Sequence, residues 1–217
     1  MAIEREKILD AALAVLNEVG LDQFTTRKLA DRLGVQQPAL YWHFASKSAL
    51  LDALNAEMLA RFHHHRLPAP GQAWDDFALA NARSFRKALL AVRDGARINA
   101  GTHPTTREFG DAEQQLQLYV DAGFPAVEAF NIAIAITRYV VGFVLEEQGE
   151  RDRDDQEVEQ GGDPMDEVAP FPILSKALEP LIEGGTINTE SVFEGGLAYM
   201  LAGMRASLAA QNDKTAP

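Results

Sequence analysis

The amino-acid sequence predicts an all-α fold, and three observations carry that prediction. Apolar residues recur every three to four positions along almost every segment, and no convincing run alternates apolar with polar residues. The chain has 217 residues, 47% of them apolar, which is ample for one or two packed cores. It has no cysteine, so a disulfide framework, thiolate-bound zinc and thiol catalysis are excluded.

The N-terminal segment is expected to form three short helices and the start of a longer one. The first helix spans about residues 4–19, with its apolar positions on one face. The second follows Thr25, whose hydroxyl suits an N-cap, and ends before Gly34. The third begins at Pro38, where a missing N–H costs nothing, and Ser46 caps the longer fourth helix.

Residues 66–72, with two prolines and a glycine, mark the boundary between a domain at 1–66 and a second helical domain at 67–217. The long fourth helix joins the two domains. The segment at about 149–169 is acidic and nearly free of large apolar groups, so we expect a mobile loop there. Helices of the second domain are expected at 72–91, 94–100, 106–122, 125–149, 170–182 and 189–211.

The net charge of −12 comes largely from one segment. Residues 1–66 carry eight basic and eight acidic side chains, whereas residues 146–167 hold eleven acids and two arginines. The overall charge therefore excludes no class of partner. The N-terminus does not resemble a signal peptide, and no 18-residue stretch looks apolar enough to span a bilayer, so we expect a cytoplasmic protein with no membrane partner.

Residues 25–54 have the size of a helix-turn-helix, in which the second helix lies in the major groove of DNA. Gln37 can pair with adenine, Arg27 can reach guanine, and Ala39 can touch a thymine methyl group. The aromatic and basic residues that follow suit phosphate contacts. The alternative is a helix pair that only packs, with its aromatic residues in the core. The candidate DNA-binding residues are Thr26, Arg27, Gln37, Pro38, Ala39, Tyr41, Trp42, His43 and Lys47.

The stretches TTRKLADRLGV, PALYWHF and SKSALLDAL, in that order, resemble the DNA-binding domain of the TetR (tetracycline repressor) family. The run QPALYWH, together with LLDAL, is similar to the tetracycline repressors within that family. Two stretches of the second domain, FRKALLAVRDGARINAGTHP and YVVGFVLEEQ, are similar more loosely and in the same order. The resemblance implies a homodimeric repressor that binds a palindromic operator in double-stranded DNA and is released by a small-molecule inducer.

Two apolar stripes are candidates for the dimer interface that the resemblance implies. They lie on the helices expected at 125–149 and 189–211. Periodicity alone equally allows a monomer core. The stripes are Ile132, Ile136, Val140 and Val144 on the first helix, and Val192, Gly196, Met200 and Met204 on the second.

The resemblance also implies an inducer pocket. His63, Asn81 and Phe85 match the residues that contact the rings of the inducer. Thr102, Pro104 and Gln115 match the walls of the pocket, and Glu146 matches an acid that holds metal-bound water. Two positions depart from the family pattern, since Asn99 replaces a magnesium-binding histidine and His103 replaces an arginine. An amide oxygen can coordinate Mg²⁺ but lacks the basicity of imidazole. We therefore expect a tetracycline-like or other polycyclic or aromatic inducer and no required cofactor, with Mg²⁺ bound alongside the inducer as the alternative.

Other functions remain open at this point. The same helix-turn-helix serves a transcriptional activator, or a regulator without a tetracycline-type inducer. An enzyme that uses His63, His103 and Glu146 is a remote alternative, which no nucleophile motif, Gly-rich phosphate loop or zinc-ligand spacing supports. The run of histidines at 63–65 does not suggest a metal site, because consecutive helical positions point in different directions.

Overall fold

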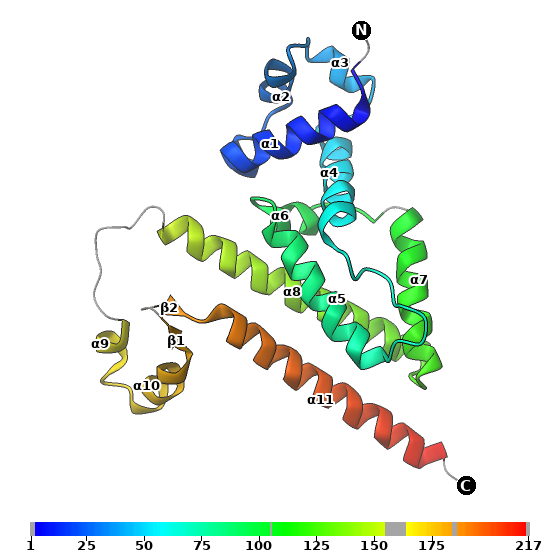
Figure 1. The fold of residues 1–217 in the computed structure, drawn as a ribbon, viewed down its shortest axis with the longest axis vertical. Helices are drawn as coiled ribbons and strands as arrows, with labels where there is room; N and C mark the ends of the chain where they lie inside the picture. The colour runs from blue at the N-terminus through cyan, green and yellow to red at the C-terminus, as the bar shows by residue number, and fades with distance from the viewer. Residues whose placement is uncertain (1–2, 105, 155–163, 184–185, 216–217) are drawn as a thin grey trace. The chain divides into compact units, whose positions relative to one another are not determined.

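The structure is a computed structural model that describes residues 3–104, 106–154, 164–183 and 186–215. In this part of the chain the regular elements are helices, apart from one short hairpin (Figure 1). The all-α prediction is therefore confirmed. The chain divides into two compact units, Met1–Gln148 and Gly149–Pro217. The boundary predicted at 66–72 falls inside the first unit, where these residues form the loop between α4 and α5.

Local capping residues set the ends of the N-terminal helices, which are α1 (Arg5–Gln23), α2 (Thr26–Leu33), α3 (Pro38–Tyr41) and α4 (Lys47–Phe62). The hydroxyl of Thr25 accepts a hydrogen bond from the Lys28 N–H at 3.1 Å. The hydroxyl of Ser46 accepts one from the Ala49 N–H at 3.0 Å. Both caps were predicted, because a side-chain oxygen at this position satisfies a backbone donor that the helix leaves free.

The N-terminal helices pack around a small apolar core. Ile8 and Leu16 of α1, Leu29 of α2 and Leu50 of α4 are almost completely buried, and so is Phe24 between α1 and α2. The three helices α1–α3 and the first half of α4 therefore form one packed head. The remaining half of α4 runs into the body of the first unit (Figure 1).

The body of the first unit contains α5 (Trp74–Leu90), α6 (Gly95–Ala100), α7 (Thr106–Asp121) and α8 (Ala126–Asp154). Helix α4 packs on α5 and α6, and a buried ion pair between Arg86 and Glu147 joins α5 to α8 at 3.0 Å. The side chain of Gln148 holds α6 in place, since it accepts from the Ala96 N–H and donates to the carbonyls of Leu89 and Val92.

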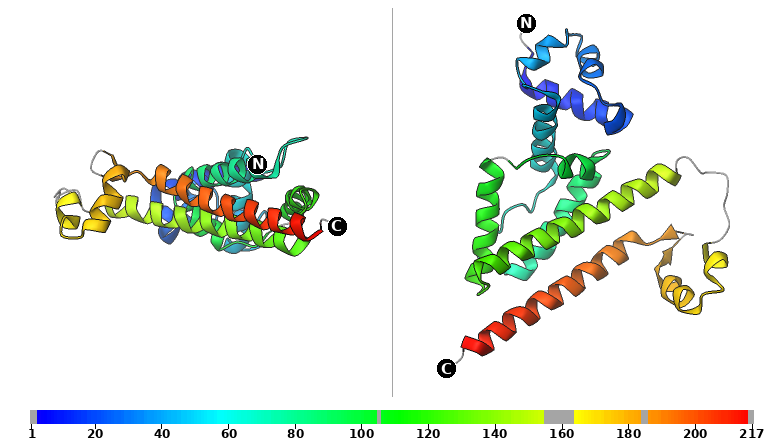
Figure 2. Two further views of the ribbon diagram at one scale, coloured as in Figure 1. Left: turned by 90° about the horizontal axis from the view of Figure 1, so that it is seen from below. Right: turned by 180° about the vertical axis from the view of Figure 1, so that it is seen from behind.

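The second unit contains α9 (Pro164–Val168), α10 (Pro172–Leu178), the 3₁₀ turn η1 (Glu179–Leu181), a two-stranded hairpin and the long helix α11 (Thr189–Thr215). Strands β1 (Ile182–Glu183) and β2 (Thr186–Ile187) pair antiparallel, with Ile182 opposite Ile187. The short elements lie near the N-terminal end of α11 (Figure 2).

The acidic segment expected as a mobile loop at 149–169 is partly helical. Helix α8 continues to Asp154, and α9 covers Pro164–Val168. The prediction was wrong in those parts because Glu, Gln and Arg favour helix, and extending an existing helix requires no new nucleation. The rest of the predicted loop, residues 155–163, lies outside the described residues.

Helix α8 corrects two further expectations. Its apolar stripe Ile132, Ile136, Val140 and Val144 is buried inside the chain, so these residues belong to the core and do not face a partner. Other apolar side chains of α8 are exposed, including Val127 and Phe130. Because both faces are apolar, the segment Ala126–Glu150 is long and apolar enough to cross a membrane by length and composition, contrary to the sequence expectation.

Candidate functional site

Helix α3 presents an exposed surface on the head. Gly34 adopts a left-handed conformation (φ 65°) that ends α2, and the buried side chain of Leu40 then anchors α3 against the head. Trp42 is 90% exposed and Tyr41 is 47% exposed. The alternative in which these aromatic residues belong to the core is therefore wrong.

The start of α3 is fixed to the start of α2 by one side-chain hydrogen bond. The Gln37 amide donates to the Thr26 hydroxyl at 2.7 Å, and both side chains are half-buried. Arg27 follows Thr26 and is exposed. This bond holds the Gln37 side chain in place, which reduces the conformational entropy that it would lose on binding a partner.

Lys47 has a structural contact that the sequence did not indicate. Its ammonium group donates to the Phe24 carbonyl at 2.8 Å and lies 5.8 Å from the centre of the Phe24 ring. Lys47 thus holds the end of α1 against the start of α4. His43 is half-buried and lies beside the ring of Phe44. The DNA contacts assigned to both residues stay predictions.

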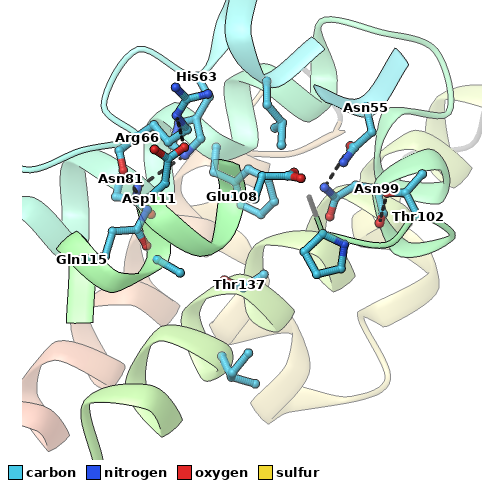
Figure 3. A pocket seen from close by; sticks show the side chains of 15 residues that line it. Asn55, His63, Arg66, Asn81, Asn99, Thr102, Glu108, Asp111, Gln115 and Thr137 are labelled. Atoms are coloured by element: carbon cyan, nitrogen blue, oxygen red, sulfur yellow. Dashed lines mark hydrogen bonds and ion pairs between the residues drawn. The ribbon is translucent and has the colours of Figure 1, made fainter. Parts of the chain in front are cut away.

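A cavity of about 380 Å³ lies in the body of the first unit, lined by side chains from α4 to α8 and their loops (Figure 3). Among the described residues, the lining includes seven of the nine predicted ligand contacts: His63, Asn81, Phe85, Asn99, Thr102, Pro104 and Gln115. The volume suits a multi-ring small molecule. Figure 3 shows the polar residues in two groups, one around His63 and one around Asn99, with Glu108 between them.

His103 and Glu146 do not line this cavity. The His103 side chain is exposed, and its backbone N–H donates to the Asp52 carboxylate at 3.4 Å. Glu146 is exposed as well, whereas the neighbouring Glu147 is buried against Arg86. Adjacent residues on a helix differ in direction by about 100°, and the sequence alone does not show which of two glutamates faces inward.

Sequence reasoning missed several lining residues: Asn55, Leu59, Arg66, Glu108, Asp111, Ala112, Ile134 and Thr137. A helical spacing signal was present for some of them. Asn55 and Leu59 lie eight and four residues before His63, and Asp111 lies four before Gln115, so each set shares one helix face. Nothing local marks Arg66, which follows the end of α4.

His63 is a buried, neutral histidine at one end of the cavity. Burial is the main reason that its pKa falls to about 4, and the positive charge of Arg66 lowers the pKa further. Its Nδ1 lies 3.0 Å from the Ser84 hydroxyl, and its Nε2 lies 3.4 Å from the Asn81 amide nitrogen. His64 and His65 are exposed in the turn after α4, whereas His63 is buried.

Asn99 at the other end joins the cavity to α4. Its side-chain amide nitrogen donates to the Asn55 side-chain oxygen at 3.0 Å, and the Thr102 hydroxyl donates to the backbone carbonyl of Asn99 at 3.0 Å. The side chain of Asn99 therefore offers a metal ion one neutral oxygen, that of its amide. No three His, Asp or Glu side chains within the described ranges are grouped to hold a metal ion.

The start of α6 is bonded directly to the head. The Asp94 carboxylate accepts from the Leu21 N–H at 2.7 Å. Arg97 then bridges Asp94 and Asp22, at 2.8 and 2.7 Å. The break in α1 at Gly20 (φ 73°) makes room for this contact, since a Cβ there would lie 3.1 Å from the Asp94 carboxylate. A short helix that lines the cavity thus touches both α1 and α4.

A helix-turn-helix head connected in this way to a ligand-sized cavity defines a ligand-responsive, DNA-binding transcriptional regulator. Two family descriptions match the chain: "Bacterial regulatory proteins, tetR family" at residues 8–54 and "Tetracyclin repressor-like, C-terminal domain" at residues 67–208. The chain therefore belongs to the TetR family of transcriptional repressors, and it is not an enzyme.

Similar proteins are tetracycline repressors. The class A repressor from transposon 1721 of Escherichia coli is 46% identical over 93% of this chain and 90% of its own. A TetR variant from Acinetobacter baumannii AYE, solved with minocycline, has a TM-score of 0.77 at 40% identity, over 95% of this chain and 98% of that one. Class A TetR, solved with 5a,6-anhydrotetracycline and magnesium, has a TM-score of 0.73 at 40% identity, over 94% and 99% of the two chains.

Proposed function

We propose that this chain acts as a homodimer that represses transcription from a palindromic operator and leaves it when a tetracycline-like polycyclic ligand enters the cavity. The single observation that carries the proposal is the hydrogen bond between Asn99 and Asn55, because it joins the cavity wall to the helix that begins in the head. The identity to tetracycline repressors over nearly the whole chain supports the ligand class.

On DNA, α3 is the recognition helix. Gln37, Pro38 and Ala39 read base edges in the major groove, and Arg27 with Thr26 adds contacts from the start of α2. The exposed aromatic rings of Tyr41 and Trp42, with His43 and Lys47, fix the register on the phosphates.

The ligand acts through α6. Ligand contact at Asn99 or Thr102 changes the α6 position, and the bonds from α6 to α4 and to the Gly20 turn carry that change to the head. The separation of the two recognition helices then no longer matches the operator. The ligand's preference for one of the two states limits the size of the effect.

The dimer interface involves surfaces other than the stripe first expected on α8. Val127, Phe130 and Leu145 remain exposed on α8, and Val192 and Tyr199 on α11. Apolar surface left exposed in this way is typical of a helix that pairs with another chain.

A repressor that binds an operator has to be in the compartment that holds the chromosome, so we place the protein in the cytoplasm.

Mg²⁺ is not required for the ligand to bind in this proposal, because Asn99 supplies a neutral amide oxygen where the resemblance expects imidazole. His103 and Glu146, outside the cavity lining, stay predicted ligand contacts that a ligand complex would test.

The test is a fluorescence-anisotropy titration of the protein onto its own upstream DNA at fixed salt. Anhydrotetracycline is then added with Mg²⁺ or with EDTA. We expect tight binding without ligand, and DNA release by the drug in both conditions. Binding that ignores the drug would refute the tetracycline class, and release only with Mg²⁺ would refute the metal-independent step.

A further inference from the structure

An ion pair lies in the wall of the cavity near His63. The Nε of Arg66 and the Oδ2 of Asp111 are 2.9 Å apart, and the two side chains are 21% and 12% exposed. Both residues line the cavity, Arg66 from the loop after α4 and Asp111 from α7 (Figure 3).

The ion pair leaves hydrogen-bonding capacity unused. Both atoms are buried, and within the described part of the chain neither one takes part in a hydrogen bond, although they are at ion-pair distance. The N–H of Arg66 is therefore not aligned with the Asp111 oxygen. Asp111 as a whole is 9% exposed, so its carboxylate has little access to bulk water. A buried polar atom without a hydrogen bond destabilises the cavity wall, and a suitable ligand group removes that cost.

The nearest amide and imidazole groups are directed elsewhere. The Gln115 amide donates to the Arg66 carbonyl at 2.7 Å, and the Asn81 amide donates to the His65 carbonyl at 3.0 Å. The His63 Nδ1 lies against the Ser84 hydroxyl. These contacts hold the 63–66 segment in shape. A donor for Asp111 is therefore best supplied by the ligand.

The charges of the lining point to the kind of donor. A carboxylate only accepts hydrogen bonds, and the Arg66 side chain that faces Asp111 is not aligned as a donor. His63 carries no competing positive charge near neutral pH, because burial lowers its pKa to about 4. A carboxylate that is partly shielded from water forms its strongest hydrogen bonds with cationic N–H groups, which favours a cationic group on the ligand.

We propose that Asp111, held in place by Arg66, is a specificity-determining residue that selects polycyclic inducers carrying a protonated amine. The ammonium N–H donates to the Asp111 carboxylate in a charge-assisted hydrogen bond. This inference rests on the proposed function and names the chemistry recognised at one end of the same cavity.

The test compares two ligands that differ only in the amine: anhydrotetracycline and its 4-de(dimethylamino) analogue. The affinity of each for the full-length protein is measured by calorimetric titration at pH 7 and one fixed Mg²⁺ concentration. We expect the unaltered protein to prefer the amine-bearing ligand by about tenfold or more, as expected for loss of a buried charged hydrogen bond. In Asp111→Asn, the preference should fall below about threefold.

Glu113→Gln is the matched control, because Glu113 is exposed on the same helix and does not line the cavity. It should keep the full preference. If Asp111→Asn does not fold, the double variant Arg66→Leu with Asp111→Leu carries the same test without leaving an unpaired buried charge.

Equal affinity for both ligands in the unaltered protein would overturn the inference and leave the proposed function standing. So would a preference that Asp111→Asn, or the double variant, retains. If neither ligand binds, the proposed tetracycline class is refuted and this inference with it.

Discussion

At the scale of a single residue, His63 lines the cavity and also makes the stability of the fold depend on pH. Its ring lies 5.4 Å from that of Phe85 in the cavity wall, and its pKa of about 4 lies well below the ordinary value of 6.5. Between these two pH values the unfolded chain binds a proton that the folded chain does not bind. The free energy of unfolding therefore falls as the pH drops from 6.5 towards 4.

The first prediction concerns this proton. We expect the histidine to contribute up to about 3 kcal/mol of stability above pH 6.5 that is lost by pH 4. Urea unfolding of the unaltered protein and of His63→Gln between pH 7 and 4.5 checks it. The unaltered protein should lose more stability than His63→Gln, whereas His64→Gln, at an exposed position, should behave like the unaltered protein. Parallel pH curves for all three would contradict the assignment.

At the scale of elements, α6 is placed by a close backbone approach. A Cβ on Gly95 would lie 2.2 Å from the Leu89 carbonyl and 3.1 Å from the sulfur of Met58 on α4. Only glycine permits α6 to start this near the end of α5. The packing of α6 against α4 and α5 thus depends on the absence of a side chain at Gly95.

The second prediction is that Gly95→Ala lowers the free energy of unfolding by about 1–3 kcal/mol, the usual cost of overpacking, and weakens ligand control of DNA binding. Gly110→Ala on α7 is the control. Nothing lies within 4 Å of its added Cβ, so alanine should leave stability unchanged or raise it by up to about 1 kcal/mol. Denaturant titration and operator release measure both effects. Equal stability of the two variants would show that α6 has room to shift.

At the scale of the whole molecule, the proposed homodimer carries two heads, which have to match a DNA site with two halves. The head region at 1–66 is electrically neutral in a chain of net charge −12, so the local arrangement of its basic side chains, and not the total charge, attracts DNA. The proposed homodimer implies a twofold operator.

The third prediction is that half-site centres about 34 Å apart are required. Inserting about five base pairs between the half-sites turns them to opposite faces of the duplex and should weaken binding by about 100-fold or more. Substituting the same central base pairs without insertion is the control. Anisotropy at fixed salt measures both, and unchanged affinity after insertion would mean that a single head binds alone.

Most helices and the helix-turn-helix could be predicted, because their signals are local. Thr25 and Ser46 cap their helices as expected, and the candidate DNA-binding residues all fall within one stretch of the chain, between Thr26 and Lys47. The ligand cavity was predictable only in part, through the resemblance. The resemblance implies Glu146, which is exposed and outside the described cavity lining, and its ligand contact stays a prediction.

The all-α class, the helix-turn-helix and the family follow from local signals, since caps, apolar spacing and motifs act over a few residues. Three features follow only from long-range packing: which stripe of α8 is core, the bond from α6 to the head through Asp94, and the pairing of Arg66 with Asp111 in the cavity. These facts depend on how helices distant in the chain pack together. Local propensity does not contain that information.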